Sequence, residues 1–443
     1  MNDTISPLIE KSGAFEEVLK CIRGGQLPCS VFGVTQNAKP YFAEAVRRSV
    51  HKQVLCITAT EQSARDLASA TGGILFPDDD FSLRSVEAKG REAELVRVGI
   101  LKNTAHIKGV VFLSARAFLS RMMPPECFAA SCFLLKAGDN YDMDGLMETL
   151  TKNGYEHAGT VYSKGEFARR GEILDIFPSD SKRPVRVTFF DDEIESIRFF
   201  DSETQKSQGS PLGEYLLPPA REVVLGEDAK EKLYEYLKKQ DNSELAERLS
   251  VAVEEYGTLD NADTFLPVMF SPAYITDYFP DALLLFDDFE YVYTEAGRVK
   301  AEFDDACARL VKEGEAFLVQ CESIGTLTPV LKKQEGRILD MAGGKNARLK
   351  TVCEADMQLR AAPGYNGRID MLAEAIKDRV KHGYAVGLYA GGKAKSLSEA
   401  LKEFDMIAPV LAKPQEKGVF VSEEYIPYGF EIPSARTIVL GLN

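Results

Sequence analysis

The chain has 443 residues, of which 45% are hydrophobic and 27% are charged, and this balance excludes a largely disordered or fibrous chain. A length of this size corresponds to about three domains. The formal net charge of −15 argues against broad, sequence-independent contact with a nucleic-acid backbone, because such contact needs Lys and Arg concentrated on one face.

The first third of the chain alternates short apolar runs with amphipathic stretches. Strands are predicted over residues 30–35, 53–59, 74–77 and 109–114, and helices over residues 41–50 and 61–70. Strands that alternate with helices predict a parallel sheet covered by helices. A charged helical stretch follows over 85–101, and the character of the sequence changes near residue 132.

The turn GVTQNAKP, residues 33–40, joins the first predicted strand to the first predicted helix. A phosphate-binding loop has the form G-x-x-x-x-G-K-[ST], in which backbone N–H groups and the Lys hold phosphates and the hydroxyl holds magnesium. Gly33 and Lys39 fit this form, but Ala38 replaces the second glycine and Pro40 replaces the hydroxyl residue. We therefore predict a degenerate nucleotide loop that does not bind ATP.

Residues 155–200 are rich in strands separated by polar turns, which predicts an antiparallel meander. The strand runs are GTVYS, EILDIFP, PVRVTFFDD and EIESIRFFD. In PVRVTFF, alternation places Val185, Val187 and Phe189 toward the core. Arg186 and Phe190 then point toward solvent.

An exposed aromatic side chain beside an arginine has the composition of a binding hot spot. Arg170 precedes the neighbouring strand and is expected to join the same patch. In the alternative interpretation, Arg186 pairs across strands with Glu172 or Glu193, and a neighbouring helix covers Phe190. The pattern by itself leaves both interpretations open.

Helical periodicity returns over 228–256, and an apolar strand over 282–288 precedes a long charged helix around 295–314. This strand ends in Asp287 and Asp288, where an ATPase would have Asp-Glu. Asp288 is too short to replace a Glu that positions the attacking water. Two degraded halves of an ATPase site predict an ancestry whose chemistry has been lost.

A small α/β unit is predicted after a Gly/Lys-rich linker near 335–350. Its helices are expected over 369–382 and 394–404, and its strands over 384–390, 418–422 and 436–442. The sequence stops on a strand, so we expect a fragment of a longer protein.

Neither a secretory signal nor an apolar run of the roughly 18 residues that span a membrane is visible, so we expect a cytoplasmic protein without membrane contact. The eight cysteines form no C-x-x-C pair, and the four histidines lie far apart. We therefore predict no metal site and expect the thiols to be reduced.

Several strings resemble the excision-repair protein UvrB and, more closely, the N-terminal UvrB-like module of the bacterial transcription-repair coupling factors (the Mfd family). They are GVTQNAKP, SARAFL (114–119), GEFARRGEILDIFP (165–178) and RPVRVTFFDDEIESIRFFDSETQKS (183–207). The resemblance covers about residues 10–335 and continues more weakly through the small α/β unit. The broken loop, the lack of a Tyr-rich β-hairpin after FPDDDF (76–81) and the lack of helicase motifs separate the chain from UvrB itself.

This resemblance implies an α/β multidomain fold. A degenerate RecA-like, P-loop-like domain is interrupted by a mainly antiparallel β domain and followed by a small α/β domain. The implied parts are domain 1A (1–131), an inserted UvrA-interaction domain (132–212), domain 1B with a linker (213–345) and a small domain (346–443).

The resemblance further implies that the chain recruits UvrA to lesions where RNA polymerase has stalled, in nucleotide excision repair. The residues carried over for UvrA binding are Arg170, Arg186 and Phe190, with Arg169 and Glu193 as weaker candidates. No catalytic residue and no cofactor is implied for this segment. ATP, magnesium, RNA polymerase and DNA would engage parts beyond residue 443, and those parts are expected to contact this segment.

Two alternatives remain open at this point. One is a UvrB-like subunit that still binds ATP and damaged DNA. The other is a structural module whose UvrA face stays hidden inside the full protein.

Overall fold

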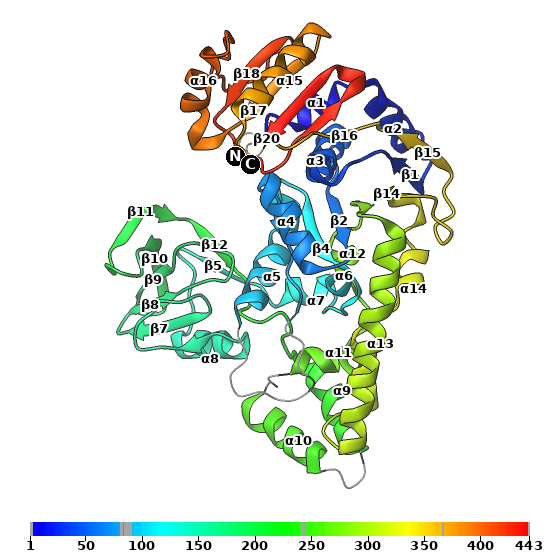
Figure 1. Ribbon diagram of the computed structural model, residues 1–443. Coiled ribbons are helices and arrows are strands. Elements are labelled where there is room, and N and C mark those ends of the chain that lie inside the picture. The colour runs from blue at the N-terminus through cyan, green and yellow to red at the C-terminus, as the bar shows by residue number, and fades with distance from the viewer. Residues whose placement is uncertain are drawn as a thin grey trace.

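The computed structural model describes residues 3–79, 83, 91–240, 244–257, 259, 261–365 and 367–441. Within these ranges the strands form a seven-stranded, a six-stranded and a five-stranded sheet and a two-stranded ribbon. Figure 1 shows the seven-stranded sheet in the middle of the molecule, with the six-stranded sheet to one side and the five-stranded sheet above. None of the helices described is long and apolar enough to cross a membrane.

The seven-stranded sheet pairs its strands in parallel throughout, as the sequence predicts. Its order is β15 (Cys353–Asp356), β1 (Cys29–Phe32), β14 (Ile338–Met341), β13 (Leu283–Phe286), β2 (Val54–Thr58), β4 (Val111–Ser114) and β3 (Ile74–Leu75). The strands are buried on both faces because alternate side chains enter two different cores. In β13, Leu284 and Phe286 belong to one core and Leu283 and Leu285 to the other.

Helices from distant parts of the chain cover the two faces. One face carries α1 (Ser6–Glu10), α2 (Gly13–Arg23), α3 (Lys39–Val50) and α4 (Glu61–Thr71). The core of the other face includes residues of α5 (Glu92–Lys102), α6 (Ala115–Leu119), α7 (Pro125–Ala130), α9 (Glu227–Lys238), α10 (Glu244–Tyr256), α11 (Leu266–Met269), α12 (Ile275–Tyr278), α13 (Phe289–Glu313) and α14 (Leu327–Lys332).

The linker predicted near 335–350 is wrong, because β14 lies inside it as a buried strand between β1 and β13. Its four residues include the charged Asp340 and are flanked by glycine and charged residues, which gave the segment the composition of a linker. The next strand, β15, also joins this sheet, at its edge beside β1.

The six-stranded sheet has the order β11 (Ser207–Leu212), β10 (Glu193–Phe200), β9 (Val185–Phe190), β8 (Ile173–Ile176), β7 (Glu166–Arg170) and β6 (Glu156–His157). From β7 to β11 every neighbouring pair is antiparallel, which confirms the meander. The strand predicted at GTVYS is wrong: this segment forms no ladder, and the strand is β7, which starts three residues later.

Helix α8 (Met143–Lys152) packs on one face of this sheet through Leu146 and Leu150, which share a core with Phe167 and Val187. The opposite face is called the outer face below. The chain enters this unit through β5 (Phe133–Lys136) and leaves it through β12 (Glu214–Leu217), which pair as the antiparallel ribbon. The insertion is therefore connected to the rest of the chain through two adjacent strands.

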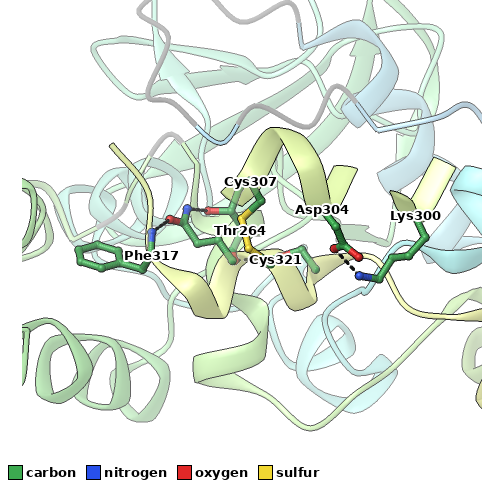
Figure 2. The surroundings of a disulfide bond; sticks show 8 residues. Thr264, Lys300, Asp304, Cys307, Phe317 and Cys321 are labelled. Atoms are coloured by element: carbon green, nitrogen blue, oxygen red, sulfur yellow. Dashed lines mark hydrogen bonds and ion pairs between the residues drawn. A yellow bond between two sulfur atoms is a disulfide. The ribbon is translucent and has the colours of Figure 1, made fainter. Parts of the chain in front are cut away.

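The expectation of reduced thiols is wrong for four cysteines, which form two disulfides. One joins Cys21 of α2 to Cys353 of β15. The other joins Cys307 of α13 to Cys321 of the short helix η4 (Leu318–Ser323), and Figure 2 shows it beside Thr264. Spacing could not reveal the first pair, because Cys21 and Cys353 are 332 residues apart and meet only through the tertiary fold. Cys307 and Cys321 are only 14 residues apart and meet because η4 packs against α13.

The five-stranded sheet has the order β16 (Arg360–Ala361), β19 (Phe430–Ile432), β20 (Thr437–Gly441), β17 (Ala385–Tyr389) and β18 (Gly418–Ser422). Helices α15 (Ile369–Lys381) and α16 (Ala394–Lys402) pack on one face. The other face shares its core with the N-terminal helices: Phe430 lies against Tyr41, and Thr4 hydrogen-bonds with Tyr389 across 385 residues of sequence. The two ends of the chain thus build one core.

Candidate protein-binding face and the loop after the first strand

The alternation predicted for β9 is confirmed. Val185, Val187 and Phe189 are buried, whereas Phe190 is 69% exposed on the outer face. No helix covers Phe190 in the described part of the chain, which excludes that element of the alternative interpretation. An aromatic ring this exposed leaves a large apolar area that a partner can bury.

Arg186 also lies on the outer face, but it is not free. Its Nε and Nη2 donate to the two carboxylate oxygens of Asp175 at 2.7 and 2.8 Å, and its Nη1 donates to the carbonyl of Gln205 at 3.0 Å. The guanidinium lies 4.5 Å from the ring centre of Phe200. The alternative of a cross-strand pair was therefore right in kind, although the partner is Asp175 rather than Glu172 or Glu193.

This bonding leaves only 16% of the Arg186 side chain exposed. The bidentate hydrogen bond raises the pKa of its guanidinium further above the usual value. Asp175 itself is fully buried, so the charge of Arg186 also balances an anion inside the sheet. Arg186 thus has a structural role that its outward position did not predict.

Arg170 joins the same cluster from the end of β7. Its Nη2 donates to Asp175 at 2.6 Å and to the side-chain carbonyl of Gln205 at 2.9 Å. The Arg170 side chain remains 43% exposed. Two arginines from neighbouring parts of the sheet are therefore held together by one carboxylate.

The two weaker candidates lie on different sides of the sheet. Arg169 points to the face that carries α8, where it pairs with Asp144, so its predicted place beside the patch is wrong. Adjacent strand residues face opposite sides, which separates Arg169 from Arg170. Glu193 pairs in register with Phe190 at the β9–β10 turn and is exposed beside it, as predicted.

Sequence reasoning missed Asp175 and Gln205. The register of β8 and β9 places Asp175 opposite Arg186, and this register could not be read from the sequence. Gln205 reaches the cluster from the β10–β11 turn with a positive φ of 60°, which is uncommon outside glycine. The available signal was the alternation in ILDI, which puts Asp175 on the face opposite the buried Leu174.

Replacing Arg186 with Ala is expected to lower the free energy of unfolding by about 2–3 kcal/mol, because it leaves Asp175 buried with Arg170 as its remaining charged partner. Urea unfolding of the variant and the parent measures the change. Arg198→Ala is the matched control, since Arg198 is the register neighbour of Arg186 but makes only a long bond, 3.4 Å, to a carbonyl. An equal loss in both variants would show that Asp175 does not depend on Arg186.

The loop predicted to be a degenerate nucleotide loop follows β1. Gly33 has a φ of +67°, and a Cβ there would lie 2.4 Å from the Asp356 carboxylate and 2.7 Å from the Gln358 nitrogen. The close approach of the strand β15 segment thus accounts for this glycine. Lys39, the first residue of α3, forms an ion pair with Asp287 at the end of β13. The two segments that the sequence analysis interpreted as degraded halves of an ATPase site therefore meet, and the charges of Lys39 and Asp287 neutralise each other.

A second carboxylate of this edge, Asp340 at the end of β14, is 1% exposed. It accepts hydrogen bonds from the Phe289 nitrogen at 2.8 Å and from the Asn346 amide at 3.4 Å. Burial raises its pKa to about 6, an effect that these hydrogen bonds and Lys39 oppose. Asp340 is thus a buried carboxyl group whose pKa is raised toward neutral pH.

The pKa of Asp340 predicts a pH-dependent stability. The folded chain binds this proton more tightly than the unfolded chain, whose Asp pKa is about 3.9, so the group destabilises the fold increasingly as pH rises from about 4 to 6. Asp340→Asn is expected to raise the free energy of unfolding by about 2 kcal/mol at pH 7. This advantage should shrink toward zero near pH 4. Urea unfolding at several pH values measures it, and a difference independent of pH would contradict it.

No metal site was predicted. Among the described residues, the sulfur atoms of Cys21, Cys29 and Cys353 lie within 4.8 Å of one another. Two of these sulfurs form a disulfide, and burial raises the pKa of the remaining Cys29 thiol to about 11. A thiol with such a pKa is protonated at neutral pH, which is unfavourable for a metal ligand.

Comparison with known proteins identifies relatives of this chain in sequence. Residues 133–222 match the UvrB interaction domain family. The chain is 24% identical over 99% of its length to a transcription-repair-coupling factor of Bacillus subtilis, and 28% identical over 87% of its length to one of Mycobacterium bovis. It spans 40% and 34% of these relatives. The predicted resemblance to the transcription-repair coupling factors is confirmed.

Proposed function

We propose that this chain is the amino-terminal part of a transcription-repair coupling factor and that the outer face of its six-stranded sheet binds UvrA. The observation that carries the proposal is Phe190, 69% exposed on the same face of the sheet as the Arg170–Asp175–Arg186 cluster, within the segment that matches the UvrB interaction domain. An exposed aromatic ring and an arginine with unused donors on one face have the composition of a binding hot spot.

In this proposal the seven-stranded sheet is a degenerate RecA-like domain that does not hydrolyse ATP. The parallel sheet, the loop after β1 and the acidic end of β13 support this assignment, because they lie where a P-loop protein holds its nucleotide. The Lys39–Asp287 ion pair supports the loss of ATP binding. The lysine that would reach phosphate and the carboxylate that would hold magnesium neutralise each other.

The whole protein would work in the cytoplasm, where its remaining parts would use ATP and magnesium to move on DNA and displace stalled RNA polymerase. This chain would then recruit UvrA to begin nucleotide excision repair. The remaining parts would also contact this chain.

Size-exclusion chromatography of this chain mixed with purified UvrA tests the proposal. We expect a stable complex that elutes ahead of either protein. Separate elution at concentrations of tens of micromolar would contradict it. Calorimetry with ATP and magnesium separates this function from that of a UvrB-like ATP-binding subunit, which would bind ATP with micromolar affinity.

A further inference from the structure

One buried carboxylate lies beneath the proposed UvrA-binding face. Asp175 is fully buried in β8, in register with Ala168 of β7 on one side and Arg186 of β9 on the other. It accepts two hydrogen bonds from Arg186 and one from Arg170. A buried anion is stable only when it is paired, and here one anion serves two cations.

The two arginines use this anion differently. Arg186 commits its Nε, Nη1 and Nη2 to groups within the domain. Arg170 commits only Nη2, and its Nε and Nη1 have no hydrogen-bond partner among the residues that the structure describes. Arg170 is therefore the arginine with donors left for a partner. Arg186 holds the Asp175 carboxylate that supports Arg170.

Gln205 supports Arg170 from the other side. Its side-chain carbonyl accepts from Arg170, its backbone carbonyl accepts from Arg186, and its amide nitrogen donates to the Ser202 carbonyl at 2.7 Å. The Arg170 guanidinium is thus held at one nitrogen by two acceptors from separate segments of the chain. This arrangement restricts the rotamers of a side chain that is otherwise half exposed.

We propose that Asp175, together with Gln205, is a positioning residue for UvrA binding: it holds the guanidinium of Arg170 in the orientation in which its free donors meet an acidic group of UvrA. This inference rests on the proposed function and deepens it. Fixing a long side chain before association removes part of the entropy cost of binding.

The test compares Asp175→Asn with the parent chain for UvrA affinity, measured by calorimetry below the melting temperature of each variant. Asn keeps the size of the side chain but cannot neutralise two guanidinium groups. We expect affinity to fall by about 3- to 10-fold. Asp180→Asn is the matched control, because Asp180 is another nearly buried carboxylate of this insertion. It forms an ion pair with Lys102 of α5, with 2.5 Å between the two charged groups, and it is not part of the outer-face cluster. It should lower stability without changing affinity.

A double-mutant cycle distinguishes positioning from a general structural effect. In an Arg170→Ala background, Asp175→Asn should change affinity by less than about 2-fold, because there is no side chain left to position. Independent, additive losses would overturn the inference. A parent chain that fails to bind UvrA would instead overturn the proposed function, and the inference with it.

Gln205→Gly provides a second route if Asp175→Asn does not fold. Glycine accepts the positive φ of this position and keeps the carbonyl that Arg186 uses, while removing the acceptor of Arg170. We expect a loss of about 2- to 5-fold in affinity that disappears in the Arg170→Ala background. Unchanged affinity of this folded variant would contradict the proposal.

Discussion

Replacing Phe190 with Ala is expected to weaken UvrA binding by at least about 30-fold while leaving the stability of the chain nearly unchanged. Truncation of a hot-spot aromatic residue costs about 2–4 kcal/mol of binding free energy. Because the ring is 69% exposed in the free chain, its removal leaves no cavity in the core. Calorimetric titration of UvrA and a thermal melt measure the two quantities on the same sample.

Tyr428→Ala is the control for this prediction. Tyr428 is similarly exposed, at 57%, but it lies in the segment before β19 of the five-stranded sheet. Its removal should alter neither UvrA affinity nor the melting temperature. If Phe190→Ala binds UvrA as tightly as the Tyr428 variant does, the outer face is not the binding surface.

Replacing Lys39 with Met should lower the free energy of unfolding by about 3–5 kcal/mol, because it leaves the Asp287 carboxylate without its partner in a nearly buried site. Adding Asp287→Leu should restore much of this loss, since the second change removes the stranded charge. Urea unfolding of the two single variants and the double variant measures the coupling.

Lys20→Met is the control, because Lys20 forms an ion pair with Glu17 in which both side chains are mostly exposed. An exposed pair contributes about 0–1 kcal/mol. Additive losses from Lys39→Met and Asp287→Leu would show that the pair does not couple the loop to the end of β13. Stabilisation of the parent chain by ATP would show that the site still accepts a nucleotide.

Much of the fold could be predicted because alternation and helical periodicity are local signals. Strands β2, β9, β13 and β17 and helices α3, α4 and α15 lie where these signals placed them. The failures share a physical cause. β14 is short and flanked by glycine and charged residues, and only its position between two other strands buries it. The Cys21–Cys353 disulfide, too, depends on contact between segments 332 residues apart.

In the proposed site, too, local features could be predicted and contacts between strands could not. Alternation correctly placed Phe190 on the outer face, because the period of a strand is local. It could not show that a buried carboxylate would fix Arg186, since Asp175 reaches it only through the register of two strands. It also could not place Arg169, because the strand that carries it was predicted elsewhere. The identity of exposed residues was therefore easier to predict than the partners of half-buried ones.

The core shared by the N-terminal helices and the five-stranded sheet has a consequence for synthesis on the ribosome. Thr4 and Tyr389 meet across 385 residues, and Tyr41 packs on Phe430. At a synthesis rate of about 5–20 residues per second, roughly 20–80 s pass between synthesis of the first helices and synthesis of the residues that cover their apolar side. During this interval the nascent chain exposes an apolar surface of the kind that chaperones bind. Truncation before the five-stranded sheet would make that exposure permanent, so shortened versions of this chain should aggregate even though the seven-stranded sheet is complete.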